Sequence, residues 1–210
     1  GYDGSGWAVA VLDTGVDKTH SWFSTDSKVV SEACYSTKFG DVSSLCPGGV
    51  EASTASGSGV DCGVIDGCDH GTHVAGTVAG NDGVGPGFGV ARGADIIAMQ
   101  VFSQFNDSGD CSPYPAPCVL SYSSDQISAL SRVLELSATM DIASVNMSLG
   151  GGRYFDQASC DASNSGVKAA IDLLRTAGVA TVISAGNDGY TDSIGAPGCV
   201  STAVSVGATT

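Results

Sequence analysis

The chain has 210 residues, 42% of them hydrophobic and 14% charged, which predicts one globular domain and excludes wholesale disorder. Eight Lys plus Arg against 22 Asp plus Glu give a net charge of −14. The negative electrostatic field of this charge repels phosphate backbones and anionic lipids, so we expect neither nucleic acid nor a membrane as partner. No apolar run reaches the roughly 18 residues of a membrane span, and the N-terminal residues lack the order of a signal peptide.

The eight cysteines are even in number and fall mostly into close pairs. The pairs are Cys34 with Cys46, Cys62 with Cys68, and Cys111 with Cys118, leaving Cys160 and Cys199. This arrangement favours disulfides formed in an oxidising compartment, and predicts a secreted, extracellular protein. Zinc is the alternative, but there is no Cys-x-x-Cys and no Cys-rich stretch is joined by a suitably spaced His pair. The sequence leaves the disulfide connectivity open.

Five short apolar runs predict buried strands. They lie at 7–12, 95–102, 142–147, 179–184 and 202–206. The first run, WAVAVL, ends in Asp13-Thr14-Gly15, and continuous apolar runs stopped by turn residues are typical of strands that are buried on both faces. The runs therefore predict a parallel sheet.

Two segments between these strands have helical periodicity. In 125–140 the residues Ile127, Leu130 and Leu134 share one face, and 167–177 repeats the pattern before Gly178. Alternating strands and helices specify a layered α/β fold with right-handed crossovers and no internal domain boundary.

Two stretches interrupt this alternation, 36–67 and 106–117. Both are rich in Cys and turn-forming residues, so we expect surface loops that disulfides pin.

Two segments near the N-terminus offer acid–base chemistry. Asp13 ends a predicted strand, and open α/β sheets place their sites at the carboxyl ends of strands, although Asp there can also be a turn residue. The stretch 69–80, DHGTHVAGTVAG, predicts a helix with Asp69 as N-cap, His70 in the first turn and His73 as a hydrogen-bonded structural residue. It lacks the His-Glu-x-x-His spacing that zinc would require.

Two later segments offer substrate contacts. The stretch 145–151, VNMSLGG, is a strand running into glycines, where an extended peptide could pair or where the chain simply turns. The stretch 184–189, SAGNDG, places Asn187 at the end of another strand. Its amide is able to donate hydrogen bonds to a developing oxyanion, although Asn between glycines is also an ordinary turn.

Four segments together, VLDTGVD, HGTHVAGTVAG, VNMSLGG and SAGNDG, resemble the motifs of the subtilisin-like serine proteases, in the same order. The resemblance runs from Trp7 to Thr210 apart from the two Cys-rich stretches. It implies an α/β, three-layer subtilisin-like fold with a mostly parallel central sheet and helices on both faces.

The resemblance also implies roles for single residues. Asp13 would orient and stabilise the imidazolium of His70, which acts as general base and then acid, and Asn187 would donate to the oxyanion. The residues expected to bind substrate are Ser148, Leu149, Gly150 and Gly151, as an added-strand wall, and Gly195, as the floor of a pocket for a large apolar side chain.

By the same likeness, the Ala196–Pro197 bond would be cis. Asp188 and Asp192 lie near the rim of that pocket, where they either favour basic residues or are solvated loop acids.

One motif of the family is missing. The Gly-Thr-Ser-Met-Ala motif with the nucleophilic Ser occurs nowhere in the chain. We therefore expect residues 1–210 to be a partial peptidase domain, truncated at both ends, inactive alone and poorly stable because apolar sheet surface is exposed. The expected partners are protein or peptide substrates, the missing C-terminal portion, and a propeptide or inhibitor.

The leading functional hypothesis is a serine endopeptidase that works through an Asp-His-Ser triad and an acyl-enzyme. A catalytically inactive, peptide-binding pseudoprotease is the alternative. A disulfide-stapled acidic adhesion domain would leave the ordered motifs unexplained.

No cofactor is expected for catalysis, but the family often binds structural calcium. The acidic loop Asn81-Asp82-Gly83 could supply oxygen ligands. The position where an acidic ligand would be expected after the Asp13 motif holds Trp22 instead.

Overall fold

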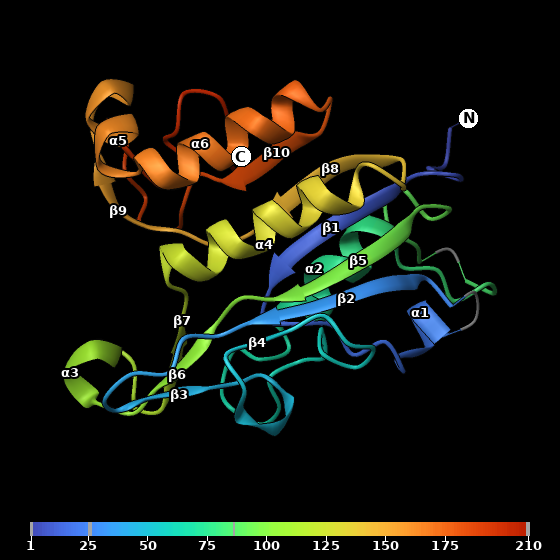
Figure 1. Ribbon diagram of the computed structural model, residues 1–210, viewed down its shortest axis with the longest axis horizontal. Helices are drawn as coiled ribbons and strands as arrows, with labels where there is room; N and C mark the ends of the chain where they lie inside the picture. Colours follow the sequence, from blue (N-terminus) through green and yellow to red (C-terminus); the bar gives the residue numbers. More distant parts are fainter. Residues whose placement is uncertain (1, 25–26, 86, 209–210) are drawn as a thin grey trace.

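A seven-stranded sheet forms the centre of the computed structural model, which describes residues 2–24, 27–85 and 87–208 (Figure 1). The strand order is β12-β10-β8-β1-β5-β2-β4, and every pairing is parallel except that of β2 with β4. The strands are β1 (Ala8–Asp13), β2 (Val29–Tyr35), β4 (Ala52–Ser53), β5 (Asp95–Gln100), β8 (Ile142–Met147), β10 (Ala180–Ser184) and β12 (Val204–Val206). The mostly parallel sheet that the apolar runs predict is confirmed.

The central strand β1 shows why its sequence is continuously apolar. All six of its residues are buried between β5 and β8. Because side chains alternate along a strand, Ala10 and Leu12 enter the core on one face of the sheet while Val9 and Val11 enter the core on the other. Both faces must therefore be covered by other elements.

Helices cover both faces, as predicted. On one face α4 (Ser123–Leu136) and α6 (Ser165–Thr176) contribute Leu130 and Ile171 to the larger core, while on the other α2 (His70–Ala79) contributes Ala75. Figure 1 shows α4 crossing the near face of the sheet, with α2 behind β1 and β5. The three-layer fold is confirmed.

Several boundaries differ from the prediction. The helix predicted to reach residue 140 ends at Leu136, and residues 137–139 form turns instead. The strand predicted at 95–102 ends at Gln100, because both the N–H and the C=O of Phe102 bond the side chain of Gln100 and divert the backbone from the sheet. Asp69 does precede α2, but its side chain makes no capping hydrogen bond.

The two Cys-rich stretches are more ordered than the loops that the sequence predicts. Three short strands, β3 (Val42–Ser44), β6 (Ser103–Phe105) and β7 (Cys118–Leu120), form a separate antiparallel sheet. The remaining elements are α1 (Ser21–Ser24), a 3-10 turn (Pro47–Gly49), α3 (Ser108–Cys111), α5 (Gln157–Ser163), and the paired strands β9 (Gly151–Tyr154) and β11 (Ile194–Ala196). Inside the stretches 36–67 and 106–117 lie only β3, β4, the 3-10 turn and α3, and three disulfides hold the stretches. The prediction of loops that disulfides pin is therefore confirmed apart from these short elements.

All eight cysteines form disulfides, which confirms the predicted disulfides and contradicts the alternative of zinc binding. The pairs are Cys34–Cys46, Cys62–Cys68, Cys111–Cys118 and Cys160–Cys199. The fourth pair closes a sequence separation of 39 residues. A chain-entropy model of the unfolded state assigns such a loop about 4 kcal/mol of stabilisation.

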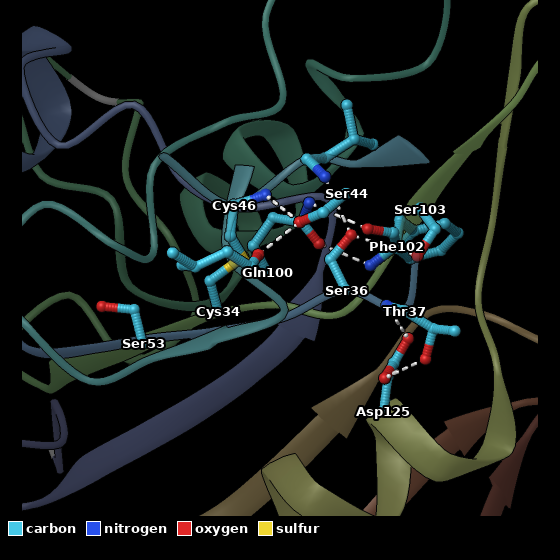
Figure 2. Close-up of a disulfide and its surroundings, with 12 residues drawn as sticks. Cys34, Ser36, Thr37, Ser44, Cys46, Ser53, Gln100, Phe102, Ser103 and Asp125 are labelled. Carbon is cyan, nitrogen blue, oxygen red and sulfur yellow. Dashed lines mark hydrogen bonds between the residues drawn. A yellow bond between two sulfur atoms is a disulfide. The ribbon is translucent and has the colours of Figure 1, made fainter. Parts of the chain in front are cut away.

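The Cys34–Cys46 disulfide lies within a polar network that joins the antiparallel sheet of β3, β6 and β7 to the central sheet. Figure 2 shows Cys34–Cys46 beside Gln100, with Thr37 facing Asp125. Asp125, near the start of α4, accepts hydrogen bonds from the Thr37 N–H and hydroxyl at 2.9 Å each. The segment directly after β2 is thus fixed to α4 as well as to the sheet.

Two surface properties complete the fold. Val204 and Val206 in the edge strand β12 are 50% and 52% exposed. Among the described residues, the helices are all too short or too polar to cross a membrane.

Candidate active site

Asp13 and His70, 57 residues apart in sequence, are in direct contact. Asp13 is the last residue of β1 and is fully buried, whereas His70 opens α2 and its side chain is 48% exposed. His70 Nδ1 lies 2.7 Å from Asp13 Oδ1. Because a carboxylate oxygen accepts, the ring donates from Nδ1, and its Nε2 is left to accept a proton from another group.

The two oxygens of the Asp13 carboxylate differ in their hydrogen bonds. Its Oδ1 also accepts from the Thr14 N–H at 2.7 Å, while its Oδ2 has no partner among the described residues although it is buried. Both hydrogen bonds of the carboxylate therefore fall on Oδ1, the oxygen that faces the His70 ring.

The surroundings of His70 favour its charged form. The hydrogen bond to Asp13 raises the pKa of His70, partial burial opposes that shift, and the charges of Asp13 and Asp69 add to it. A residue that takes up a proton during a reaction needs this kind of support for its imidazolium.

Two further residues, which the sequence analysis did not single out, hold α2 against β1. The Thr14 hydroxyl donates to the Cys68 carbonyl and accepts from the Gly71 N–H, both at 2.9 Å. A Cβ at Gly71 would lie 2.2 Å from the Gly15 carbonyl oxygen, so only glycine permits this approach. The signal in the sequence is a hydroxyl residue directly after Asp13 and a glycine directly after His70.

The predicted substrate wall leaves β8 and enters β9. Residues 148–150 lie outside every strand, and β9 begins at Gly151. Asn146 donates to the Ser148 hydroxyl at 3.0 Å, and the Leu149 side chain packs into the larger core. The segment is therefore anchored by its side chains while its backbone stays out of the sheet.

A cavity of about 440 Å³ adjoins this wall. Its lining consists of Phe102, Leu120, Ser121, Ser123, Gln126, Leu149, Gly150, Gly151, Tyr154, Asn164, Ala196 and Pro197. Gly195 itself does not line the cavity but lies in β11, where a Cβ would come within 3.4 Å of the Gly151 oxygen. The Ala196–Pro197 bond is cis, as expected.

Asn187 lies in the exposed loop between β10 and β11, and within the described residues no hydrogen bond joins it to Asp13 or His70. Because β10, β8 and β1 are parallel neighbours, their carboxyl ends place Asn187, Ser148 and Asp13 along one edge of the sheet. The predicted residues thus share an edge, and two of them are in contact.

A larger cavity, of about 640 Å³, lies on the outer side of α2. His73, Trp22 and three carboxylates, among them Asp61, line it, but Asp13 and His70 do not. Burial and the charge of Asp17 raise the pKa of Asp61. The His73 ring makes no hydrogen bond within the described residues, so the prediction of a hydrogen-bonded structural His73 is wrong.

The loop that could hold calcium uses its oxygen atoms internally. Asn81 Oδ1 accepts from the Gly83 N–H, and Asp82 Oδ1 accepts from two further backbone N–H groups. The indole of Trp22 fills the space beside the loop, since a Cβ at Gly80 would lie 2.2 Å from its ring. No group of three or more His, Cys, Asp or Glu suited to a metal ion occurs in the described parts of the chain.

Known proteins resemble this chain along nearly its whole length. Subtilisin DY from Bacillus licheniformis is 31% identical over 211 residues, covering 99% of this chain and 58% of that protein. A cuticle-degrading serine protease from Orbilia oligospora is 28% identical over 98% of this chain and 36% of its own length. The solved structure of S41 psychrophilic protease matches with a TM-score of 0.67 at 28% identity, over 97% of this chain and 53% of that one.

The chain thus spans about half the length of the curated relatives it matches. The model of the subtilase family matches residues 4–210, and the chain therefore belongs to that family of subtilisin-like serine proteases.

Proposed function

We propose that the protein carrying this chain is a secreted serine endopeptidase that hydrolyses peptide bonds in proteins. The observation that supports this most directly is the 2.7 Å contact of His70 Nδ1 with the buried Asp13 carboxylate, at the carboxyl edge of a parallel sheet. The four disulfides favour secretion, because such bonds persist in oxidising compartments.

His70 moves the proton in each half of the proposed reaction. Its Nε2 takes the proton of a serine hydroxyl, supplied from outside residues 1–210, as that oxygen attacks the substrate carbonyl. Asp13 stabilises the resulting imidazolium, and the Asn187 amide donates to the oxyanion of the tetrahedral intermediate. His70 then protonates the leaving amine, and afterwards activates the water that hydrolyses the acyl-enzyme.

Substrate would bind as an extended strand. Residues 148–150 lie outside every strand, so their backbone would pair with a peptide, although the Leu149 carbonyl already accepts from the Ser184 hydroxyl at 3.3 Å. Gly151 continues that wall. The adjoining 440 Å³ cavity, with Phe102 and Leu149 in its lining, suits an apolar side chain. Gly195, the predicted floor of that pocket, does not line this cavity and lies in β11 with no side chain beside Gly151.

A peptide-binding pseudoprotease is the second candidate. It would need only the substrate wall at residues 148–151 and the adjoining cavity, which the described residues supply. Proposed partners under either function are peptide segments, including a propeptide or an inhibitor.

For the loop at Asn81, we propose that it folds without calcium, because Trp22 fills the adjoining space.

A fluorophosphonate probe separates the two candidates. The full-length natural protein that contains this sequence would be treated with the probe, and its hydrolysis of a peptide p-nitroanilide would be measured. An endopeptidase is labelled on one Ser, and His70→Ala lowers kcat by about 10⁴-fold or more. His73→Ala is the matched control, since His73 lies on the outer side of α2 and should leave kcat unchanged. Peptide binding without labelling or turnover would support the pseudoprotease.

A further inference from the structure

The loop that carries Asn187 makes few contacts of its own. Residues 186–192 are exposed, and within the described chain 186–191 make no hydrogen bond. At its start, the Ala185 N–H donates to the Val206 carbonyl at 2.8 Å, and the Ala185 carbonyl accepts from Gly195 at 3.2 Å. Something else must hold the far end if the Asn187 amide is to keep one position.

One side chain, Arg153 on β9, holds that far end. Its Nε donates to the Ser193 hydroxyl and its Nη2 donates to Asp192 Oδ1, both at 2.9 Å. The guanidinium carbon lies 4.4 Å from the centroid of the Tyr190 ring and 4.7 Å from that of the Phe155 ring. Arg153 therefore uses both its planar donor edge and its π face on the loop.

Asp192, which the sequence placed near the rim of the predicted pocket, is paired with Arg153. The Arg153 hydrogen bond, followed by that of Ser193, lowers the pKa of Asp192. Asp192 is thus a charged partner of Arg153 and not a free acid that would attract a basic substrate residue. Arg153 and Asp192 are 44% and 57% exposed, and exposed pairs contribute little to global stability, so the effect of this contact is local.

Arg153 lies close to the proposed substrate wall, so its contact with the Asn187 loop connects that loop to the wall. β9 begins at Gly151, the end of the proposed substrate wall, and Arg153 follows two residues later. We propose that Arg153 is a positioning residue, which fixes the Asn187 loop relative to the substrate wall by clamping Tyr190 and Asp192. This inference rests on the proposed function, since an oxyanion donor acts only when it is held within hydrogen-bond distance of the developing charge.

A double-mutant cycle in the full-length natural protein tests this role. Arg153→Met should lower kcat about tenfold while KM changes less than about twofold, because donor geometry and not substrate affinity is lost. In an Asn187→Ala background the same substitution should change kcat no further, because Arg153 acts through Asn187. Equal losses of kcat in both backgrounds, or no loss in the wild-type background, would overturn the proposal.

Two more variants separate geometry from charge. Arg153→Lys keeps the charge but loses the planar fork, so it should show most of the loss seen with Met. Arg132→Met is the control, because Arg132 forms an exposed ion pair with Glu135 within α4, and its kcat should equal that of the wild type. Full activity of Arg153→Lys would contradict a geometric clamp.

A second measurement does not depend on turnover. Backbone NMR order parameters of residues 186–191 should fall from about 0.85 to below 0.6 in Arg153→Met, at an unchanged unfolding midpoint, and stay unchanged in Arg132→Met. A loop that stays rigid without Arg153 overturns the proposal. If the wild-type protein hydrolyses no peptide, the proposed function fails, while the order parameters still decide whether Arg153 holds the loop.

Discussion

The Thr14 hydroxyl accepts the Gly71 N–H at 2.9 Å, and this contact connects the end of β1 to the first turn of α2. The same hydroxyl donates to the Cys68 carbonyl. The two residues directly after Asp13 and His70 are therefore joined to each other, so the carboxylate and the imidazole have a common support. The geometry of the proposed site depends on this support as well as on the Asp13–His70 contact.

Thr14→Val should destabilise the protein, because it keeps the shape of the side chain but leaves the Gly71 N–H and the Cys68 carbonyl without their partner. The expected cost is about 2 kcal/mol in free energy of unfolding, measured by urea denaturation. Thr77→Val is the control, since Thr77 is exposed and its replacement should change stability by less than about 0.5 kcal/mol. Equal effects of the two substitutions would contradict the supporting role of Thr14.

The pKa of His70 should fall when Asp13 is replaced by Asn, because the hydrogen bond to Asp13 is the largest cause that raises it. Asp69→Asn should lower this pKa by less, since the charge of Asp69 is the smallest contribution. An NMR titration of the His70 ring in the three proteins checks this order. An unchanged His70 pKa in Asp13→Asn would show that the contact does not control the proton.

The same pKa shift makes stability depend on pH. Because the folded-state pKa of His70 lies above its ordinary value of 6.5, its contribution is fully present below that pH. It is lost as the pH rises through the folded-state pKa. Denaturation of wild type and Asp13→Asn across this window should show the difference between them shrinking as pH rises.

The fold could be predicted because its strands carry a strong local signal. The buried run at β1 and the amphipathic segment at α4 each encode burial in consecutive residues. The strands β3, β6 and β7 could not be predicted, since each has three residues and their stability comes from pairing with distant segments. The ordered motifs identified Asp13 and His70, but the support by Thr14 depends on a contact across 57 residues.

The contact of Arg153 with Asp192 could not be predicted from the sequence, because it too joins residues that are far apart in the chain. Arg153 and Asp192 are 39 residues apart, and neither belongs to a motif. The sequence placed Asp192 near a pocket rim but could not show whether its charge was free. Only the pairing of β9 with β11 brings the two side chains together.

Removing the Cys160–Cys199 disulfide should cost more stability than removing Cys111–Cys118, because the first closes 39 residues and the second only seven. Loop-closure entropy predicts losses of about 4 and about 2 kcal/mol for the paired Cys→Ser variants. Urea denaturation of both double variants measures the difference. A larger loss at Cys111–Cys118 would mean that native-state packing, rather than loop length, determines the effect.

Trp22 should stabilise the loop at Asn81 without any help from calcium. Its indole packs against the glycines at 76, 80 and 87, and its carbonyl accepts the Asn81 N–H at 2.9 Å. Trp22→Ala should therefore cost about 3 kcal/mol in free energy of unfolding, while a chelator or added calcium should leave the melting temperature of the wild type unchanged.

The control for this prediction is Trp7→Ala, because Trp7 is 50% exposed and its removal should cost less than about 1 kcal/mol. Thermal and denaturant unfolding, each with calcium and with chelator, measure both variants. A melting temperature that rises with calcium in the wild type would show that the loop binds the ion despite Trp22. A small cost for Trp22→Ala would instead show that the hydrogen bonds of Asn81 and Asp82 hold the loop by themselves.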